Sequence, residues 1–244
     1  MKLSFVIPAC NERESVRELV EGILHYSSGH DVQMLFIDDG STDGTREILE
    51  GYFSSHSRML PFEEKKKPGQ ADVSLVLKDK NEGKGSAIRE GLKHVTGNVV
   101  VIQDGDLEYD PMDWMKMLKL MEEKGASVVY GSRILGKGRK SSFAFYFGGR
   151  LLSFLTNLLY GSGITDEPTC YKMFRTDVIK SIRLESMGFE FCPEVTSRVL
   201  RKGYRIFEVP IKYEPRMISE GKKIRWKDGV IAIKILLKNR FRND

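Results

Sequence analysis

The chain has 244 residues, of which 41% are hydrophobic and 30% charged, a composition typical of globular proteins and a length that suits one large α/β domain. Its formal net charge of +5 is concentrated at one end, since residues 212–244 hold ten Lys or Arg against four Asp or Glu. The three widely spaced cysteines indicate neither a disulfide framework nor a zinc site, which favours a reducing cytosolic compartment. The N-terminus reaches Pro8 too soon for a signal peptide, so no cleaved targeting segment is expected.

The first 130 residues alternate between apolar runs and amphipathic stretches. Runs that are apolar at nearly every position predict buried strands, at residues 3–7, 32–37, 73–77, 99–102 and 127–130. Apolar residues at helical spacing predict helices between these strands, and the polar residues 54–72 predict an exposed loop. This alternation predicts an α/β fold, a doubly wound and mostly parallel sheet with helices on both faces.

Acidic or glycine-bearing loops follow three of these strands, where a sheet of this kind binds its ligands. Asp39 follows the second strand and Lys84 follows the third. After the fourth strand, Asp104 and Asp106 are separated only by Gly105, and a turn there could bring both carboxylates to one side. The pair would then suit Mg²⁺, which takes one or two protein carboxylates plus substrate phosphates. A solvated acidic turn is the alternative.

The second half of the chain shows a different pattern of apolar residues. Residues 143–160 are strongly apolar along one face, with Arg150, Ser153 and Asn157 on a polar stripe, and are marginal for a membrane span of about 20 apolar residues. An interfacial amphipathic helix and a buried core helix remain the two interpretations. Further on, the sequence predicts strands at 172–175 and 206–211 and helices at 193–202 and 226–241. The division expected is a catalytic domain over 1–213, including an amphipathic helix at 141–161, and a basic amphipathic segment over 214–244.

Several common sites are absent from the sequence. No Gly-x-Gly-x-x-Gly follows the first strand, Gly83-Lys84 lacks the Walker A pattern, and no Gly-x-Ser-x-Gly elbow occurs. The four histidines show no ligand spacing. What remains is a sheet edge with acids, Lys84 and the arginines Arg133 and Arg216, which suits a diphosphate held with a metal ion. A nucleotide-sugar donor is the natural candidate.

Five motifs in order resemble family 2 of the glycosyltransferases, which has the GT-A fold. They are residues 8–12 (PACNE), 38–45 (DDGSTDGT), 81–85 (NEGKG), 103–108 (QDGDLE) and 130–133 (YGSR). Within that family the chain is most similar to the dolichol (polyprenyl) phosphate mannose or glucose synthases, over about residues 3–241. The resemblance implies that the base and ribose are held by Pro8, Asn11, Glu12 and Asp39, with Lys84 and Asp104 near the nucleotide.

The resemblance also implies a metal site and catalytic residues. Asp104, Asp106 and Glu108 would bind Mg²⁺ or Mn²⁺, and Asp106 would act in catalysis. The two arginines Arg133 and Arg216 would be catalytic as well, gripping the acceptor phosphate or the donor diphosphate.

The function expected is metal-dependent, inverting transfer of a hexose from a GDP-mannose or UDP-glucose type donor to polyprenyl (dolichol) phosphate. A phosphate oxygen needs no general base, whereas a saccharide hydroxyl, the alternative acceptor, would need one, with Asp166 or Glu167 as candidates. A third interpretation is a non-catalytic nucleotide-binding module recruited to membranes. The partners expected are the donor, the lipid phosphate and an anionic membrane surface, without nucleic acid, and the location is the cytoplasmic, inner face of the membrane, held peripherally.

Overall fold

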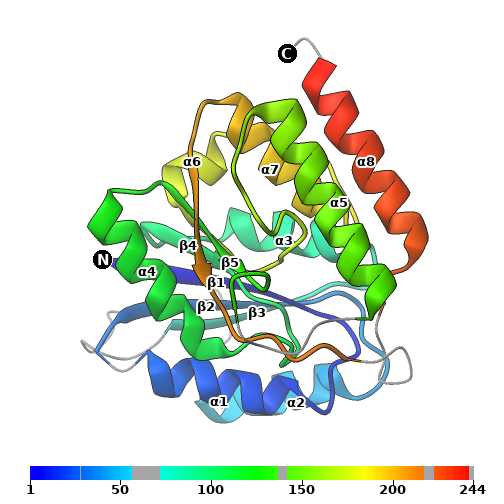
Figure 1. Ribbon diagram of the computed structural model, residues 1–244. Coiled ribbons are helices and arrows are strands. Elements are labelled where there is room, and N and C mark those ends of the chain that lie inside the picture. The colour runs from blue at the N-terminus through cyan, green and yellow to red at the C-terminus, as the bar shows by residue number, and fades with distance from the viewer. Residues whose placement is uncertain (28, 57–71, 137–141, 217–222, 242–244) are drawn as a thin grey trace.

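The computed structural model describes residues 1–27, 29–56, 72–136, 142–216 and 223–241 (Figure 1). In these residues a single seven-stranded sheet has the order β3-β2-β1-β4-β6-β5-β7. Its strands are β1 (Lys2–Ala9), β2 (Asp31–Asp38), β3 (Asp72–Leu77), β4 (Val99–Ile102), β5 (Val128–Ser132), β6 (Lys172–Arg175) and β7 (Ile206–Pro210). Most of the expected exposed loop at 54–72 lies outside the described residues.

One strand runs against the others. The pairs β1–β2, β1–β4, β2–β3 and β5–β7 are parallel, whereas β6 is antiparallel to both of its neighbours, β4 and β5. The expectation of a mostly parallel sheet is therefore confirmed. Because β6 is reversed, the loop that leads into it reaches the edge of the sheet where the parallel strands end. Residues 161–171 are thereby placed beside the acidic loops.

The first strand is longer than the sequence indicates. It was expected to stop at Pro8, but β1 continues through Pro8 to Ala9 and pairs with β2 over that whole length. On its other side, pairing with β4 ends at Val6. Proline lacks a backbone N–H, but where no strand lies alongside on that side no ladder hydrogen bond is lost. The fifth strand also extends further than expected, to Ser132.

Helices cover both faces of the sheet, which confirms the doubly wound arrangement. One hydrophobic core packs α1 (Val16–Tyr26), α2 (Thr45–His56) and α4 (Trp114–Lys124, after the 3-10 turn η1, Pro111–Asp113) against one face. A second core packs α3 (Lys84–Lys93), α6 (Thr176–Lys180) and α7 (Phe191–Arg201) against the other. In the first core, the Phe5 and Trp114 rings meet edge to face, with centroids 5.7 Å apart.

Two helices lie outside these layers, side by side (Figure 1). They are α5 (Phe143–Tyr160) and α8 (Trp226–Phe241), joined by a small cluster of Leu152, Ala232 and Leu236. The expected division at residue 213 stays a prediction. None of the helices in the described part of the chain combines the length and hydropathy that a bilayer crossing requires.

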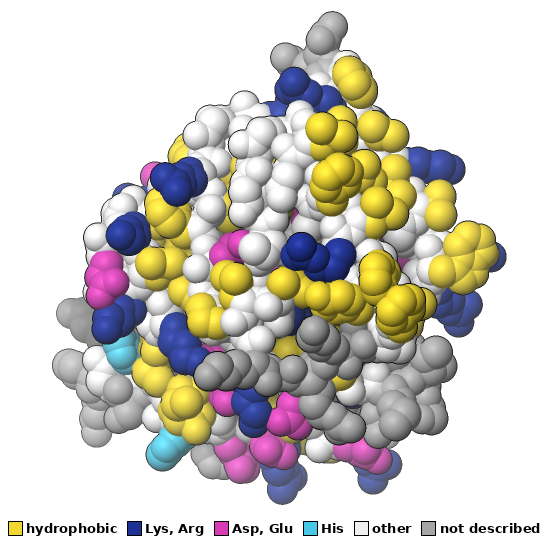
Figure 2. Space-filling model, in the orientation of Figure 1, with side chains coloured by type: hydrophobic (Ala, Val, Ile, Leu, Met, Phe, Trp, Pro, Cys, Tyr) yellow, Lys and Arg dark blue, Asp and Glu magenta, His cyan; other side chains and the backbone are white. Residues whose placement is uncertain are grey.

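The apolar face of α5 points outward. Of the polar stripe, Ser153 and Asn157 face the protein, whereas Arg150 is exposed and donates to the Thr165 carbonyl at 3.2 Å. Ser153 is buried and donates to the Gly149 carbonyl, while Phe154 is 62% exposed and Leu158 70% exposed. The exposed apolar side chains of α5 and α8 gather on one side of the molecule, next to Lys and Arg side chains (Figure 2). The interpretation of 143–160 as a buried core helix is therefore wrong.

Candidate active site

A cavity of about 330 Å³ opens at the edge of the sheet where β1, β2 and β4 end. Its wall contains most of the residues singled out from the sequence: Pro8, Glu12, Asp39, Lys84, Asp104, Asp106, Glu108, Arg133 and Arg216. Asn11 is not in the wall; it has a left-handed backbone, with φ of 55°, and its side-chain carbonyl accepts the backbone N–H of Thr42 at 2.8 Å. A direct role for Asn11 in nucleotide binding stays a prediction.

The turn after β4 depends on Gly105. A Cβ at this position would lie 2.8 Å from the carbonyl oxygen of Pro8, which is closer than real Cβ contacts come. Glycine therefore allows the Asp-Gly-Asp turn to pack on the end of β1. As a result Asp104 and Asp106 line the same cavity, and Asp104 forms an ion pair with Lys84 there.

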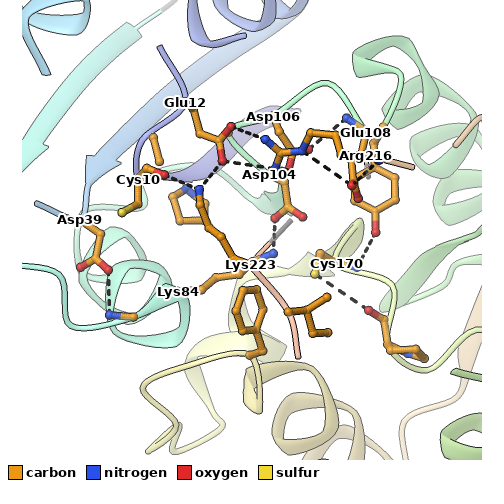
Figure 3. Close-up of a pocket in the computed structure, with 18 of the residues that line it drawn as sticks. Cys10, Glu12, Asp39, Lys84, Asp104, Asp106, Glu108, Cys170, Arg216 and Lys223 are labelled. Atoms are coloured by element: carbon orange, nitrogen blue, oxygen red, sulfur yellow. Dashed lines mark hydrogen bonds and ion pairs between the residues drawn. The ribbon is translucent and has the colours of Figure 1, made fainter. Parts of the chain in front are cut away.

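Carboxylates from distant parts of the chain converge on one guanidinium (Figure 3). Nη1 of Arg216 donates to Oε2 of Glu12 at 2.8 Å, and Nη2 donates to Asp106. The backbone N–H of Arg216 donates to Oε1 of Glu108 at 2.9 Å. Nζ of Lys223 adds a second cation, 2.5 Å from Oε1 of Glu12. The acids thus form one cluster whose charge is compensated from within the protein.

The ionisation of these groups reflects burial and mutual repulsion. Burial, followed by the nearby Asp104, raises the pKa of Asp106 to about 7, although Arg216 opposes the shift. Burial alone would lower the pKa of Lys84, but the Asp104 carboxylate outweighs it and raises that pKa. In the same way Asp106 and Glu12 raise the pKa of Arg216. A cation beside Asp106 therefore favours the ionised form of its carboxyl group.

Asp39 organises the loop that leads into α3. Its carboxylate accepts the backbone N–H of Gly83 at 2.7 Å and that of Glu82 at 3.2 Å, and it lies 2.6 Å from Nζ of Lys78. Gly83 has φ of +101°, and a Cβ there would lie 2.5 Å from the Met187 carbonyl oxygen. The loop is therefore fixed both by Asp39 and by close backbone packing, which places Lys84 at the cavity.

Arg133 is held by a chain of two carboxylates. Its Nε and Nη2 donate to the two oxygens of Asp166 at 2.8 and 2.7 Å, and its backbone N–H donates to Asp166 as well, at 2.8 Å. The backbone N–H groups of Thr165 and Asp166 donate in turn to Glu208 on β7, at 2.7 and 3.0 Å. Such a bidentate pair fixes the plane of the guanidinium. It also engages both oxygens of Asp166.

A second, more apolar cavity of about 450 Å³ adjoins the first. It lies between α5 and α8, with Leu151 and Leu152 on one side and Trp226 and Val230 on the other. The two cavities share four wall residues, Arg133, Pro168, Tyr213 and Ile224. A ligand with a charged head and an apolar tail could therefore occupy both.

Several wall residues were missed from the sequence, among them Lys223, Phe189 and Cys170. Lys223 lies in the basic segment over 214–244, and the sequence does not single it out from the other cations there. Phe189 and Cys170 carry no sequence signal, because their positions depend on how α7 and β6 pack.

The donor set fits a divalent cation held mainly by substrate. Among the described residues, no three His, Cys, Asp or Glu side chains are placed to hold a metal ion. Mg²⁺ often takes only one or two protein carboxylates, with phosphate oxygens and water completing its shell. Asp104 and Asp106 both line the cavity and suit that role. Glu108 accepts from Tyr213 and Arg216, and its place in the metal shell stays a prediction.

The mixed seven-stranded sheet, with helices on both faces and an acid-lined edge, has a GT-A-like fold. The chain belongs to glycosyl transferase family 2, whose sequence model matches residues 4–183. The expected family and fold are thereby confirmed.

Among curated relatives, the chain is 26% identical over 229 residues to a dolichol-phosphate mannosyltransferase of Pyrococcus furiosus, covering 91% of this chain and 59% of that protein. It is 28% identical over 222 residues to an undecaprenyl-phosphate 4-deoxy-4-formamido-L-arabinose transferase of Edwardsiella ictaluri, covering 90% of this chain and 62% of that protein. The chain thus spans only about three fifths of these two relatives.

Solved structures agree on the fold. Glucosyl-3-phosphoglycerate synthase from Mycobacterium tuberculosis, in complex with UDP, superposes with a TM-score of 0.70 at 18% identity, covering 100% of this chain and 81% of that one. The same enzyme has been solved with Mg²⁺ and UDP, with a TM-score of 0.70 and 17% identity over 100% of this chain and 80% of that one. At this identity the likeness establishes the fold.

Proposed function

We propose that this protein transfers a hexose from a nucleotide-diphosphate sugar to the phosphate of a membrane polyprenol. The observation that carries the proposal is the shared wall of the two cavities. The polar cavity offers acids and cations for a nucleotide diphosphate, and the apolar one runs between helices whose outer faces are apolar. The curated relatives are named for transfer to dolichol phosphate and undecaprenyl phosphate, which supports the same acceptor class.

On the donor side, Lys84 and Arg216 supply positive charge next to Asp104 and Asp106. Mg²⁺ or Mn²⁺ held by these aspartates would neutralise the charge that develops on the departing diphosphate. Pro8 and Asp39 lie in the part of the wall formed by the ends of β1 and β2, where the base and ribose would rest. The donors expected are of the GDP-mannose or UDP-glucose type.

On the acceptor side, Arg133 stands where the two cavities meet. A lipid phosphate placed there has its anionic oxygen facing the donor and its isoprenoid chain between α5 and α8. That oxygen attacks the anomeric carbon as the bond to the nucleoside diphosphate breaks, which inverts the configuration. The oxygen is already ionised at neutral pH, so Arg133 needs only to orient it.

The geometry disfavours the alternative of a saccharide hydroxyl acceptor with Asp166 or Glu167 as the base. Both oxygens of Asp166 accept from Arg133, and its side chain is only 2% exposed. Glu167 is fully buried and lines neither cavity. A general base must reach the proton that it removes. A measurement of turnover distinguishes the third interpretation, a non-catalytic module, from the first.

The outward faces of α5 and α8 support attachment to a membrane surface. Phe143, Phe147 and Phe154 on α5 and Trp226 on α8 are all more than half exposed. The basic side chains of α8 add attraction to anionic lipid. We propose that the protein binds peripherally to the cytoplasmic face, where such lipids are enriched and where a nucleotide sugar would be available.

The test is incubation of the protein with polyprenyl phosphate and a panel of labelled GDP and UDP sugars, with and without a chelator. Lipid-linked sugar that disappears with chelator and with Asp106→Asn supports the proposal. A matched control is Asp110→Asn, which changes a carboxylate at the start of η1 and outside both cavity walls. Sugar transfer to an oligosaccharide but not to the lipid would support the saccharide alternative instead. Donor binding without turnover on any acceptor would favour the non-catalytic module.

A further inference from the structure

Two of the three cysteines meet at the wall of the polar cavity. Cys170 lies in the loop before β6, and Cys192 lies in the first turn of α7. Their Sγ atoms are 3.6 Å apart. A disulfide requires about 2.05 Å, so the two sulfurs would have to approach by about 1.5 Å. They are therefore in non-bonded contact, one small movement away from a covalent bond.

Both cysteines belong to segments that form one side of the cavity. Cys170 is itself a wall residue, together with Pro168 from the same loop and Phe189 just before α7. Cys192 is buried directly behind it, only 5% exposed. A bond between the two sulfurs would thus join the β6 loop to the start of α7. The polar cavity offers a small oxidant a path to the pair at Cys170.

The surroundings favour one thiolate and one thiol. The hydrogen bond from Cys170, followed by the cationic Lys172 and Lys84, lowers the pKa of Cys192 to about 6, although burial opposes the shift. The same sulfur contact and burial raise the pKa of Cys170. A thiolate is the reactive form of cysteine, and a thiol beside it can resolve the first oxidation product. Cys10 differs, because burial raises its pKa.

We propose that Cys170 and Cys192 form a reversible dithiol–disulfide pair that is oxidised by hydroperoxides. The disulfide would weaken nucleotide binding in the polar cavity. A proton passes from Cys170 to Cys192 across the sulfur contact, and the Cys170 thiolate, which faces the cavity, attacks one oxygen of H₂O₂. The O–O bond breaks, a sulfenic acid forms on Cys170, and the departing hydroxide takes up a proton as water. The sulfur of the second cysteine then attacks the sulfenic sulfur, the S–O bond breaks, and a second water leaves. The two sulfurs lose two electrons in total and the peroxide gains them.

Formation of the disulfide would act on the polar cavity through Lys84. The first turn of α3, which begins at Lys84, packs on the segment before α7: the backbone N–H of Gly85 donates to the Gly188 carbonyl at 3.2 Å, and that of Ser86 to the Met187 carbonyl at 2.9 Å. Pulling Cys192 toward Cys170 would shift this segment and the Phe189 ring beside Lys84. Nucleoside diphosphate binding is therefore expected to weaken in the oxidised protein.

The experiment treats the full chain with H₂O₂, removes the oxidant, and counts free thiols in denaturant by alkylation and intact mass. The reduced protein has three free cysteines. The proposal expects one thiol after oxidation, no dimer on a non-reducing gel, and three thiols again after dithiothreitol. Cys10→Ser, the matched control, should still lose two thiols, whereas Cys192→Ser should form no internal disulfide.

Function is read separately by calorimetric titration of each sample with UDP and GDP and by sugar transfer, comparing oxidised with reduced protein for each variant. We expect at least a fivefold loss of affinity and rate in the wild-type chain, reversed by dithiothreitol and absent in Cys192→Ser. Three retained thiols, or sulfinic acid without a disulfide, would overturn the proposal. A disulfide with unchanged nucleotide affinity would overturn its effect on the cavity. The effect on sugar transfer rests on the proposed function, whereas the thiol count does not, so the two can fail independently.

Discussion

Removing one exposed ring from α5 tests whether its outer face binds membranes. Phe154 is 62% exposed and lies outside both cavity walls. A phenylalanine can bury roughly 200 Å², so about 120 Å² of this ring is free to enter lipid. At about 25 cal/mol per Å² its full insertion would contribute about 3 kcal/mol, or about a hundredfold in partitioning. We expect Phe154→Ser to weaken binding to vesicles by between about tenfold and a hundredfold.

The assay is sedimentation with vesicles of neutral lipid and of neutral lipid mixed with an anionic lipid. Glu123→Ser is the matched control, since it replaces another exposed side chain, on α4. Neither variant should change the unfolding temperature, because neither side chain is buried. Transfer to a short, detergent-dispersed polyprenyl phosphate should survive in Phe154→Ser while transfer to vesicle-borne acceptor falls. Wild-type affinity of Phe154→Ser for both kinds of vesicle would refute the reasoning.

Three further changes probe the interior of the site. Gly105→Ala places a Cβ 2.8 Å from the Pro8 carbonyl oxygen, so we expect a loss of about 1–3 kcal/mol in urea unfolding, together with reduced transfer; unchanged values would contradict the packing role of the glycine. Asp166→Asn removes the charged partner of Arg133 and should cost about 2 kcal/mol and most of the transfer activity; if it abolishes transfer without loss of stability, the anchoring role is wrong. Burial raises the pKa of Glu167 to about 8, so the folded state holds a proton that the unfolded state releases above about pH 4.3. The free energy of unfolding should therefore fall from pH 5 to pH 8. Glu167→Gln should flatten that decline in urea titrations, and parallel wild-type and variant curves would contradict the reasoning.

The elements of this fold could be predicted well because their signals are local. Helices expected at 143–160 and 226–241 occur with those bounds, since the apolar periodicity runs along each segment. The strand expected at 172–175 also occurs with those bounds, but the sequence did not indicate its direction. The reversal of β6 follows from its pairing with β4 and β5, and a strand's own residues do not encode which neighbours it will have. The sequence of α5 likewise left open which face points outward.

The site was predictable where its residues follow strands and not where distant segments meet. Asp104 and Asp106 could be placed at a sheet edge because they directly follow an apolar run. The contact between Glu12 and Arg216 joins residues 204 positions apart, and no local pattern indicates it. The Cys170–Cys192 contact likewise depends on how α7 packs against the β6 loop. Site residues that directly follow one strand can therefore be predicted from the sequence, whereas contacts between residues far apart in the chain cannot.

Arg216 acts as a built-in counter-ion for the acid cluster, and this has a consequence for ligand binding. A divalent cation that approaches Asp106 must compete with the guanidinium for Oδ2 of that carboxylate, so its affinity is reduced by the work of breaking that ion pair. A cation that arrives together with a diphosphate offers the displaced arginine new anionic partners. Metal alone should therefore bind weakly and the metal–nucleotide complex much more tightly, and the protein can fold with these acids together before any substrate is present.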